Sequence, residues 1–215
     1  MTICLSDAGK RYNRDWIFRH LSYTFEPGGR YAITGPNGSG KSTLLQVLGG
    51  SMLTSEGRIE WTIDTKMIGP ENIYRQVSFC APYLELIEEM TLREFLRFHQ
   101  SFKPFMAGLD TNTAIDRVGL GKAAGKQLRN FSSGMKQRAK LAQCLFSDTP
   151  VVLLDEPCTN LDRSGIELYH ELVSTYCPGR LVIVSSNDEV EYRFCTRRLD
   201  ISQWKQLMPS DPSPH

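Results

Sequence analysis

The sequence has no long hydrophobic run. Its longest purely aliphatic stretches, such as residues 151–154, have the length of a strand and fall far short of the roughly 20 apolar residues of a membrane-spanning helix. The first residues, MTICLSDAGKRY, also lack the apolar stretch of a secretory signal peptide. We therefore expect that any membrane role of this chain depends on a separate partner chain.

The sequence also lacks an excess of charge of one sign, since it has 25 Lys and Arg residues and 24 Asp and Glu residues. This balance gives no bulk attraction to nucleic acid or to anionic lipid. The six cysteines are scattered, without a C-x-x-C pair or a metal-ligand spacing. They are predicted to be reduced thiols in a cytosolic protein. A length of 215 residues suits one sizeable α/β domain or two small ones.

The order of the apolar runs predicts an α/β fold. Short alternating runs separated by turn residues predict strands and hairpins in the first 34 residues. From residue 151 onward, strand and helix patterns alternate, which predicts a parallel sheet covered by helices. The expected strands there are 151–155, 181–185 and about 199–201, the expected helices are 165–176 and 188–194, and further β-like stretches are 58–63 and 76–80.

Helical spacing between about residues 91 and 146 predicts a helical insertion in this sheet. The Pro- and Ser-rich end, residues 203–215, is expected to be a flexible tail. We therefore predict a single domain over residues 1–202.

The most specific motif is residues 35–42, which fit G-x-x-x-x-G-K-[ST] between a predicted strand and a predicted helix. Glycines let successive N–H groups point at phosphate oxygens, at the positive end of the following helix. Lys41 can then reach the β- and γ-phosphates, and the Ser42 hydroxyl can bind Mg²⁺. The motif predicts a nucleoside triphosphate site formed by Gly35, Pro36, Asn37, Gly38, Ser39, Gly40, Lys41, Ser42 and Thr43.

The apolar run at residues 151–154 ends in two acids, Asp155 and Glu156. Asp155 at a strand end can hold Mg²⁺ together with Ser42, and Glu156 can accept a proton from the attacking water. An apolar strand ending in two acids is common by itself. Because the phosphate motif lies upstream, we expect ATP hydrolysis with Glu156 as the base and Lys41 as a second catalytic residue.

Between these two sites the sequence reads FSSGMKQR at residues 131–138, and the acids continue into EPCTNLD at residues 156–162. This order of motifs resembles the ATP-binding subunits of ABC transporters, over residues 2–202. The resemblance implies the ABC ATPase fold, with a P-loop NTPase core, a mostly parallel sheet, an N-terminal antiparallel β subdomain and an inserted helical subdomain. It also implies ATP and Mg²⁺ as ligands.

In this family, the serine-glycine signature binds ATP held by a second subunit, so that two chains enclose two nucleotides head to tail. The signature here departs from L-S-G-G-Q at Phe131, Ser133 and Met135. Ser132 and the Gly134 N–H, at a predicted helix N-terminus, can still bind a γ-phosphate. The resemblance further implies that the loop at Asn160, Leu161 and Asp162 lies near the shared interface.

The partners implied are a second copy or another ATP-binding subunit, and separate transmembrane permease subunits. The chain is then expected in the cytoplasm, peripheral to the inner face of the membrane, and no nucleic acid is expected. The resemblance places Tyr12 where the family has an aromatic that stacks on adenine, although Trp16 is near enough to compete. The resemblance also implies that a membrane subunit docks near the cluster of Glu85, Glu88, Glu89 and Glu94, which suggests an acidic surface for a basic cytoplasmic loop.

Two departures from the family pattern bear on the rate. Pro82 stands where members usually carry a Gln that senses Mg²⁺ and the attacking water, and proline has no side-chain donor or acceptor. Asn187 replaces the histidine that contacts the γ-phosphate, and it cannot take a proton at pH 7. Losing one transition-state donor typically lowers the rate on the order of 10²–10³-fold. We predict a slow ATPase in which Asn187 is catalytic; alternatively, Glu85 or Ser186 fills the gap.

Two other functions stay open from the sequence. One is a soluble ABC-type ATPase outside transport, although this chain has neither a second nucleotide domain nor a coiled-coil insertion. The other is a regulatory clamp that binds ATP with little turnover, which Pro82 and Asn187 favour.

Overall fold

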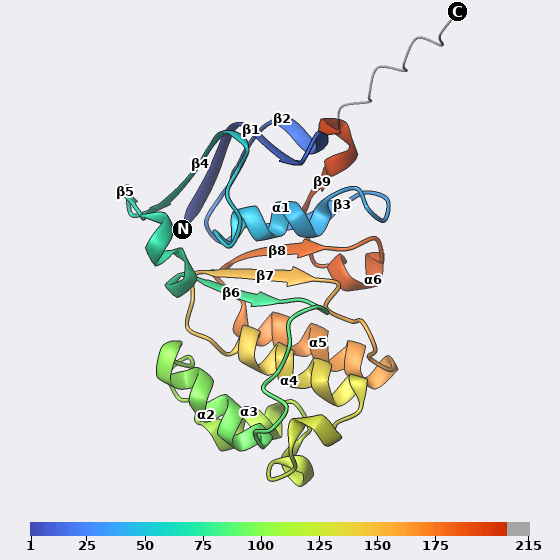
Figure 1. The fold of residues 1–215 in the computed structure, drawn as a ribbon. Coiled ribbons are helices and arrows are strands. Elements are labelled where there is room, and N and C mark those ends of the chain that lie inside the picture. Colours follow the sequence, from blue (N-terminus) through green and yellow to red (C-terminus); the bar gives the residue numbers. More distant parts are fainter. Residues whose placement is uncertain (206–215) are drawn as a thin grey trace, which may run out of the picture.

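The computed structural model describes residues 1–205, and residues 206–215 of the expected tail lie outside the described part. The strands form two sheets (Figure 1). The antiparallel sheet has the order β2-β1-β4-β5, with β1 (Thr2–Tyr12), β2 (Asp15–Phe25), β4 (Glu56–Ile63) and β5 (Lys66–Met67). The parallel sheet has the order β6-β7-β8-β3-β9, with β6 (Val77–Cys80), β7 (Val151–Asp155), β8 (Leu181–Ser185), β3 (Arg30–Thr34) and β9 (Arg197–Asp200).

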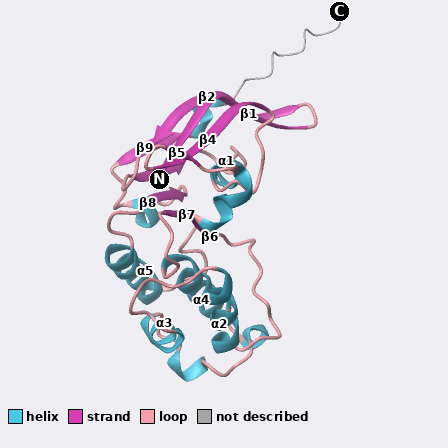
Figure 2. Ribbon diagram, turned by 90° about the vertical axis from the view of Figure 1, so that its left-hand side faces the viewer, coloured by secondary structure: helices cyan, strands magenta, loops and turns pink. Residues whose placement is uncertain are grey.

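Helices cover both faces of the parallel sheet. Helix α1 (Lys41–Leu48) lies between the two sheets, and α4 (Ser133–Leu145) and α5 (Arg163–Tyr176) lie on the opposite face, as Figures 1 and 2 show. Beyond α4 come α2 (Leu92–Phe102) and α3 (Thr111–Arg117). The shorter helical segments are α6 (Glu189–Tyr192), η1 (Pro70–Arg75), η2 (Gly121–Ala123), η3 (Leu128–Asn130) and η4 (Ile201–Trp204).

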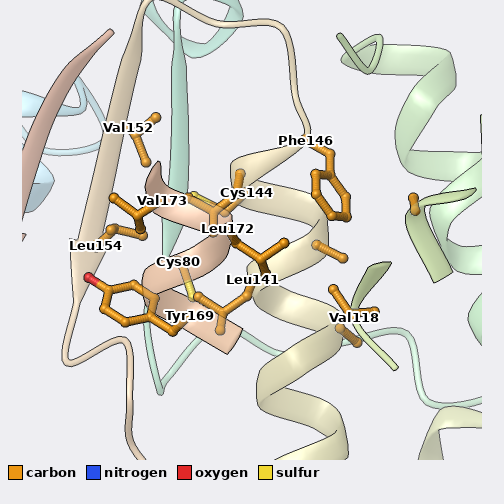
Figure 3. Close-up of a cluster of buried hydrophobic side chains, with 14 of the residues drawn as sticks. Cys80, Val118, Leu141, Cys144, Phe146, Val152, Leu154, Tyr169, Leu172 and Val173 are labelled. Atoms are coloured by element: carbon orange, nitrogen blue, oxygen red, sulfur yellow. The ribbon is translucent and has the colours of Figure 1, made fainter. Parts of the chain in front are cut away.

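The first four residues of β7 are apolar because both faces of this strand are buried. Val151 and Leu153 belong to the cluster under α1 and the antiparallel sheet. Val152 and Leu154 point to the other side, into a cluster with residues of α4 and α5 (Figure 3). Since successive side chains of a strand alternate between faces, this short strand connects the two cores and fixes the position of the acids at its end.

The predicted fold class is confirmed, with the antiparallel sheet, the parallel sheet and the helices between β6 and β7 as expected. The first hairpin is longer than the apolar runs indicated. Strands β1 and β2 continue through Asp7 and His20, whose φ angles are 50° and 56° and which lie near register shifts. These bulges interrupt the alternating pattern on which the prediction depended.

The C-terminal boundaries also differ from the prediction. The last strand is Arg197–Asp200, earlier than expected, because the Asp200 carboxylate accepts hydrogen bonds from the Ser202 N–H at 3.0 Å and Oγ at 2.7 Å and starts η4. This turn includes residues 203 and 204, which we expected in the tail, and Trp204 packs against the core.

Candidate active site

The phosphate loop, residues 35–42, connects β3 to α1 and adopts backbone conformations that favour glycine. Gly35, Gly38 and Gly40 have φ angles of 140°, 74° and 101°. A Cβ on Gly40 would lie 2.2 Å from Ile17 Cγ2 of the neighbouring sheet. The loop thus needs glycine both for its curvature and for close packing, and it leads into the N-terminus of α1, which attracts anions.

Lys41 and Asn187 both contact this loop. The Lys41 side chain is largely buried, and its Nζ donates to the carbonyl oxygens of Gly35 at 2.8 Å and Pro36 at 3.3 Å. Asn187 follows β8; its Oδ1 accepts from the Gly35 N–H at 3.3 Å, and its Nδ2 donates to Asn37 Oδ1 at 3.1 Å. The side chains of two residues predicted from distant motifs therefore contact the same loop.

The two acids lie at the end of β7, where they face different surroundings. Asp155 is only 2% exposed and pairs in register with Ser185 of β8. Glu156 is exposed, has a φ of 42°, and donates its N–H to the Ser185 carbonyl at 2.9 Å. This left-handed conformation is strained for a residue with a side chain, and such strain concentrates at functional sites. The turn keeps one carboxylate inside and directs the other to solvent.

Three buried oxygens, one in the phosphate loop and two at the ends of β7 and β8, have no hydrogen-bond partner among residues 1–205. They are Ser39 Oγ, Asp155 Oδ1 and Ser185 Oγ. Buried polar atoms are nearly always paired, so this group points to a polar ligand. A carboxylate and hydroxyl oxygens beside a phosphate-binding loop are donors suited to Mg²⁺ with a polyphosphate. The residues present fit the predicted magnesium-nucleotide ligand.

The Asp155 carboxyl group is held in a mixed environment. Burial raises the pKa of Asp155, whereas the hydroxyls of Ser42 and Ser185 and the ammonium of Lys41 act in the opposite direction. The Tyr83 hydroxyl, from the segment after β6, also acts to lower the pKa of Asp155. The surrounding hydroxyls thus favour the ionised form that would bind a cation.

The signature and the loop after Glu156 meet elsewhere in the chain, in a cleft of about 860 Å³. Ser132 caps α4 by accepting from the Met135 N–H at 3.3 Å. A Cβ on Gly134 would lie 3.0 Å from the Asn160 carbonyl oxygen, so the signature glycine packs against that loop. Within the part of the chain that the structure describes, no residue of the phosphate loop lines this cleft.

Asp162 also lines this cleft. Its Oδ1 caps α5 by accepting from the Gly165 N–H at 2.8 Å, and Arg138 of α4 lies 3.4 Å away. These contacts lower the pKa of Asp162, the Gly165 N–H contributing most. The predicted interface residue thus fixes the N-terminus of α5 beside the signature helix.

The two aromatic candidates for adenine stacking differ in exposure. Tyr12 is 46% exposed and its hydroxyl donates to Met52 Sδ at 3.2 Å. Trp16 is half-buried beneath the Arg19 guanidinium, which lies 4.4 Å from its ring centroid. Tyr12 therefore has the more accessible ring, and its role in stacking stays a prediction.

Sequence reasoning did not single out Ser185 or Tyr83 as site residues. Ser185 ends an apolar strand just as Asp155 does. The sequence feature that could have indicated Ser185 is therefore a polar residue at the end of a second apolar run. Tyr83 follows Pro82 directly, and it carries the hydroxyl that proline lacks. Of the residues proposed to fill the gap at Pro82, Glu85 is exposed, and Ser186 is buried with its Oγ accepting from the Asp188 N–H at 2.9 Å.

Comparison with known proteins decides the family to which this chain belongs. The family model described as ABC transporter matches residues 18–159, more than half of the chain. The chain belongs to the ABC transporter family. The resemblance that the motifs carried is confirmed, and the ABC ATP-binding chain has its phosphate loop, both acids and the signature inside the matched region.

Curated relatives agree with this assignment. The chain is 32% identical over 185 residues to an uncharacterized ABC transporter ATP-binding protein, YybJ, of Bacillus subtilis, covering 83% of this chain and 82% of that one. It is 30% identical to the cytochrome c biogenesis ATP-binding export protein CcmA of Paramagnetospirillum magneticum, with coverages of 81% and 82%. It is also 30% identical to the lantibiotic transport ATP-binding protein SrtF of Streptococcus pyogenes, with coverages of 87% and 82%.

Solved structures have the same fold as the ABC ATP-binding chain. A putative ABC transporter ATP-binding protein from Pyrococcus furiosus superposes with a TM-score of 0.79 at 20% identity, over 96% of this chain and all of that one. The ATP-binding cassette MJ0796, solved as a dimer bound to ADP and Pi, gives a TM-score of 0.80 at 22% identity, over 93% and 95%. Among residues 1–205, no helix has the length and apolar character needed to cross a bilayer.

Proposed function

We propose that this ABC ATP-binding subunit hydrolyses ATP as a head-to-tail dimer and drives transport through separate membrane-spanning subunits. The observation that carries this proposal is the division of one chain into two half-sites. The phosphate loop and the acids gather at the ends of the parallel strands, whereas the signature and Asp162 share a separate cleft. A second chain, related by two-fold symmetry, would bring its signature to the phosphate loop of the first.

The residues of the first half-site have complementary tasks. Loop N–H groups and the Lys41 ammonium bind the phosphates, and Ser42 and Asp155 would hold Mg²⁺. When bound, Mg²⁺ neutralises charge on the β- and γ-phosphates. Glu156, exposed at the strained turn after β7, accepts a proton from the attacking water. Asn187 keeps the loop in place and donates one neutral hydrogen bond toward the phosphates.

The turnover is slow in this proposal, because a proline and an asparagine stand in place of a glutamine and a histidine. The Asn187 amide is already engaged with Gly35 and Asn37, and it adds no positive charge beside the phosphates. Asn187→His would restore a group that can carry charge. We expect this variant to raise kcat several-fold, measured as phosphate release from the purified chain. A wild-type rate equal to that of ordinary family members would remove the case for slow turnover.

The docking surface for the membrane subunit is proposed at a cleft of about 720 Å³ after β6. It carries Glu85, Glu88 and Glu89, and the basic Lys136 and Lys140 lie beside them. Lys136 pairs with Glu88 at 2.5 Å, and Lys140 Nζ donates to the Pro82 carbonyl at 2.6 Å. Glu85 and Glu89 are therefore the acids best placed for a basic cytoplasmic loop, and the chain would lie at the cytoplasmic face of the membrane.

The test combines hydrolysis with partner capture. Glu156→Gln should abolish phosphate release while ATP binding persists, and the tagged chain should purify from native membranes, in mild detergent, with a multi-span protein in stoichiometric amount. Hydrolysis that survives the substitution would remove Glu156 as the base. A chain that purifies alone with little turnover would favour the ATP-operated clamp, and one that purifies with ribosomes would favour a non-transport ATPase. The names of the relatives differ in cargo, so the proposal covers transport without naming a substrate.

A further inference from the structure

The peptide group between Pro157 and Cys158 is held on two sides by buried side chains. Its carbonyl oxygen accepts a hydrogen bond from Gln137 Nε2 of α4 at 2.7 Å. Its N–H group donates to Glu191 Oε1 of α6 at 2.8 Å. A backbone carbonyl only accepts and an N–H only donates, so the two side chains serve both polar groups of one peptide. Together they form a clamp that opposes rotation of this peptide.

The clamped peptide follows directly on the turn that carries Glu156. On the other side of this turn, the Glu156 N–H is fixed to the Ser185 carbonyl at 2.9 Å. The ring of Pro157 fixes its φ angle, so the orientation of the next peptide depends on the ψ angle of Pro157. Rotation about that angle would turn the carbonyl away from Gln137. The chain is thereby held before and after Glu156, whose own φ of 42° is strained.

Packing alone does not account for two polar side chains at these positions. Gln137 is 3% exposed and Glu191 is 5% exposed. Besides the peptide carbonyl, Gln137 Nε2 lies 3.8 Å from Cys80 Sγ, a weak acceptor. Glu191 Oε2 is buried and has no hydrogen-bond partner among residues 1–205. Such a carboxylate is costly to bury, and an apolar side chain would fill the same space at lower cost if packing were its only role.

We propose that Gln137 and Glu191 are positioning residues for hydrolysis, which hold the Pro157–Cys158 peptide so that Glu156 faces the attacking water. This inference rests on the proposed function, since it takes Glu156 as the base. A general base must lie within hydrogen-bonding reach of the proton that it removes, and a misplacement of about 1 Å can lower a rate about 100-fold. The clamp therefore acts on the chemical step and not on nucleotide binding.

The first test compares two substitutions of Glu191. Glu191→Met keeps the length of the side chain and removes the acceptor for the Cys158 N–H, whereas Glu191→Gln keeps an acceptor oxygen. We expect Glu191→Met to lower kcat about 10- to 100-fold, with little change in KM for ATP. Glu191→Gln should stay close to the wild-type rate. Equal losses in the two variants would overturn the proposal, because only one of them lacks the acceptor.

The second test asks whether the two side chains act on one peptide. Gln137→Met removes the donor to the Pro157 carbonyl and should lower kcat about as much as Glu191→Met. Because both hydrogen bonds hold the same peptide, the double variant should lose little more than the stronger single variant. Losses that multiply would show that Gln137 and Glu191 act separately and do not form a clamp.

Tyr169→Phe is the matched control for lost stability. Tyr169 of α5 is buried, and its hydroxyl donates to the backbone carbonyl of Glu191 at 2.8 Å. The variant thus removes a buried hydrogen bond from the same residue and leaves both clamp bonds in place. It should lower the urea midpoint of unfolding about as much as Glu191→Met and leave kcat unchanged. An equal fall in kcat would overturn the proposal, because the effect would then follow the packing of α6.

Hydrogen exchange of the Cys158 amide, measured by NMR on the nucleotide-free chain, separates this proposal from the proposed function. Exchange should be at least about fivefold faster in Glu191→Met than in the wild type, because the amide loses its acceptor. A wild type without ATP hydrolysis would overturn the proposed function and the role in hydrolysis with it. Wild-type turnover together with unchanged exchange, or with faster exchange and unchanged kcat in Glu191→Met, would overturn only the role of the clamp.

Discussion

At the residue scale, two glycines of the phosphate loop both have positive φ angles but differ in the space available for a side chain. Gly38 and Gly40 both have positive φ, but a Cβ on Gly38 would meet nothing within 4 Å, whereas one on Gly40 would collide with Ile17. Both alanine variants bear a left-handed strain of about 1–2 kcal/mol. Gly40→Ala should therefore weaken ATP binding by at least about tenfold more than Gly38→Ala, since its collision adds to this shared strain. Titration with a fluorescent ATP analogue measures both, and equal losses would show that packing against Ile17 does not matter.

Also at this scale, the sequence predicted the residues whose spacing is local and missed those whose role depends on neighbouring strands. Lys41 and Ser42 belong to one continuous motif, and the family pattern led to Asn187, which does contact the loop. Ser185 pairs with Asp155, and Tyr83 leaves the sheet at the same edge, only because β8 and β6 flank β7. The spacing of residues along the chain does not indicate which strands are neighbours in the sheet. The roles of these two hydroxyls therefore could not be predicted before the strand order was known.

At the element scale, Arg180 connects the ends of elements that surround the parallel sheet. It is 5% exposed, and it donates to the carbonyl oxygens of Leu145, Ser147, Thr149 and Tyr176 at 2.7 to 3.2 Å. Arg180→Met would leave these buried acceptors unpaired, which costs about 1–3 kcal/mol for each group that water cannot reach. We expect a loss of about 3–5 kcal/mol in the free energy of unfolding by urea.

The control for Arg180 is an arginine on the surface. Arg163 is exposed and pairs with Glu167 one turn along α5 at 3.2 Å. Arg163→Met should cost less than about 0.5 kcal/mol, as exposed pairs do. If the two variants lose similar stability, the buried contacts of Arg180 contribute no more than a surface pair.

A second prediction at this scale concerns pH and the docking of α2. His99 of α2 lies 2.8 Å from Ser147 Oγ, and burial lowers the pKa of His99 to about 4 from 6.5. Between these two values the unfolded chain binds more protons than the folded chain, so the stabilisation is present above pH 6.5 and is lost as the pH falls toward 4. At pH 5 the loss is at most about 2 kcal/mol, at 1.36 kcal/mol for each pKa unit. His99→Gln should flatten the fall in unfolding free energy between pH 7.5 and pH 5, and an unchanged slope would exclude His99 as its source.

At the scale of the whole molecule, the architecture followed from the order of motifs, and the boundaries did not. A strand before the phosphate loop and another before the acids already require a parallel sheet with helices on both faces. The long hairpin and η4 were not predicted because they depend on local backbone features with weak sequence signals. These features are the positive φ angles of Asp7 and His20 and the helix cap formed by Asp200. The division into two half-sites is likewise a property of the fold, since the cleft brings together residues 119–123, 132–135, 138 and 160–162.

This division predicts that two inactive variants should complement each other. Lys41→Ala removes the cation of the phosphate loop, and Gly134→Asp places a negative charge where the γ-phosphate would meet the signature, so each chain alone should have negligible ATPase activity. In a head-to-tail dimer of one of each, one site has an intact Lys41 from one chain and an intact Gly134 from the other. Random mixing makes half of the dimers mixed, with one good site of two, so about a quarter of wild-type activity should return.

The matched control is Gly125→Asp, an identical change at a glycine in the same helical region whose Cβ would meet nothing within 4 Å and which does not line the signature cleft. It should keep wild-type activity, which separates the position of the charge from its presence. If Lys41→Ala and Gly134→Asp chains stay inactive when mixed although light scattering shows that they form dimers, both half-sites must come from the same chain. Recovery near one quarter instead requires that each ATP is shared between two chains, because no dimer of identical variants can assemble a complete site.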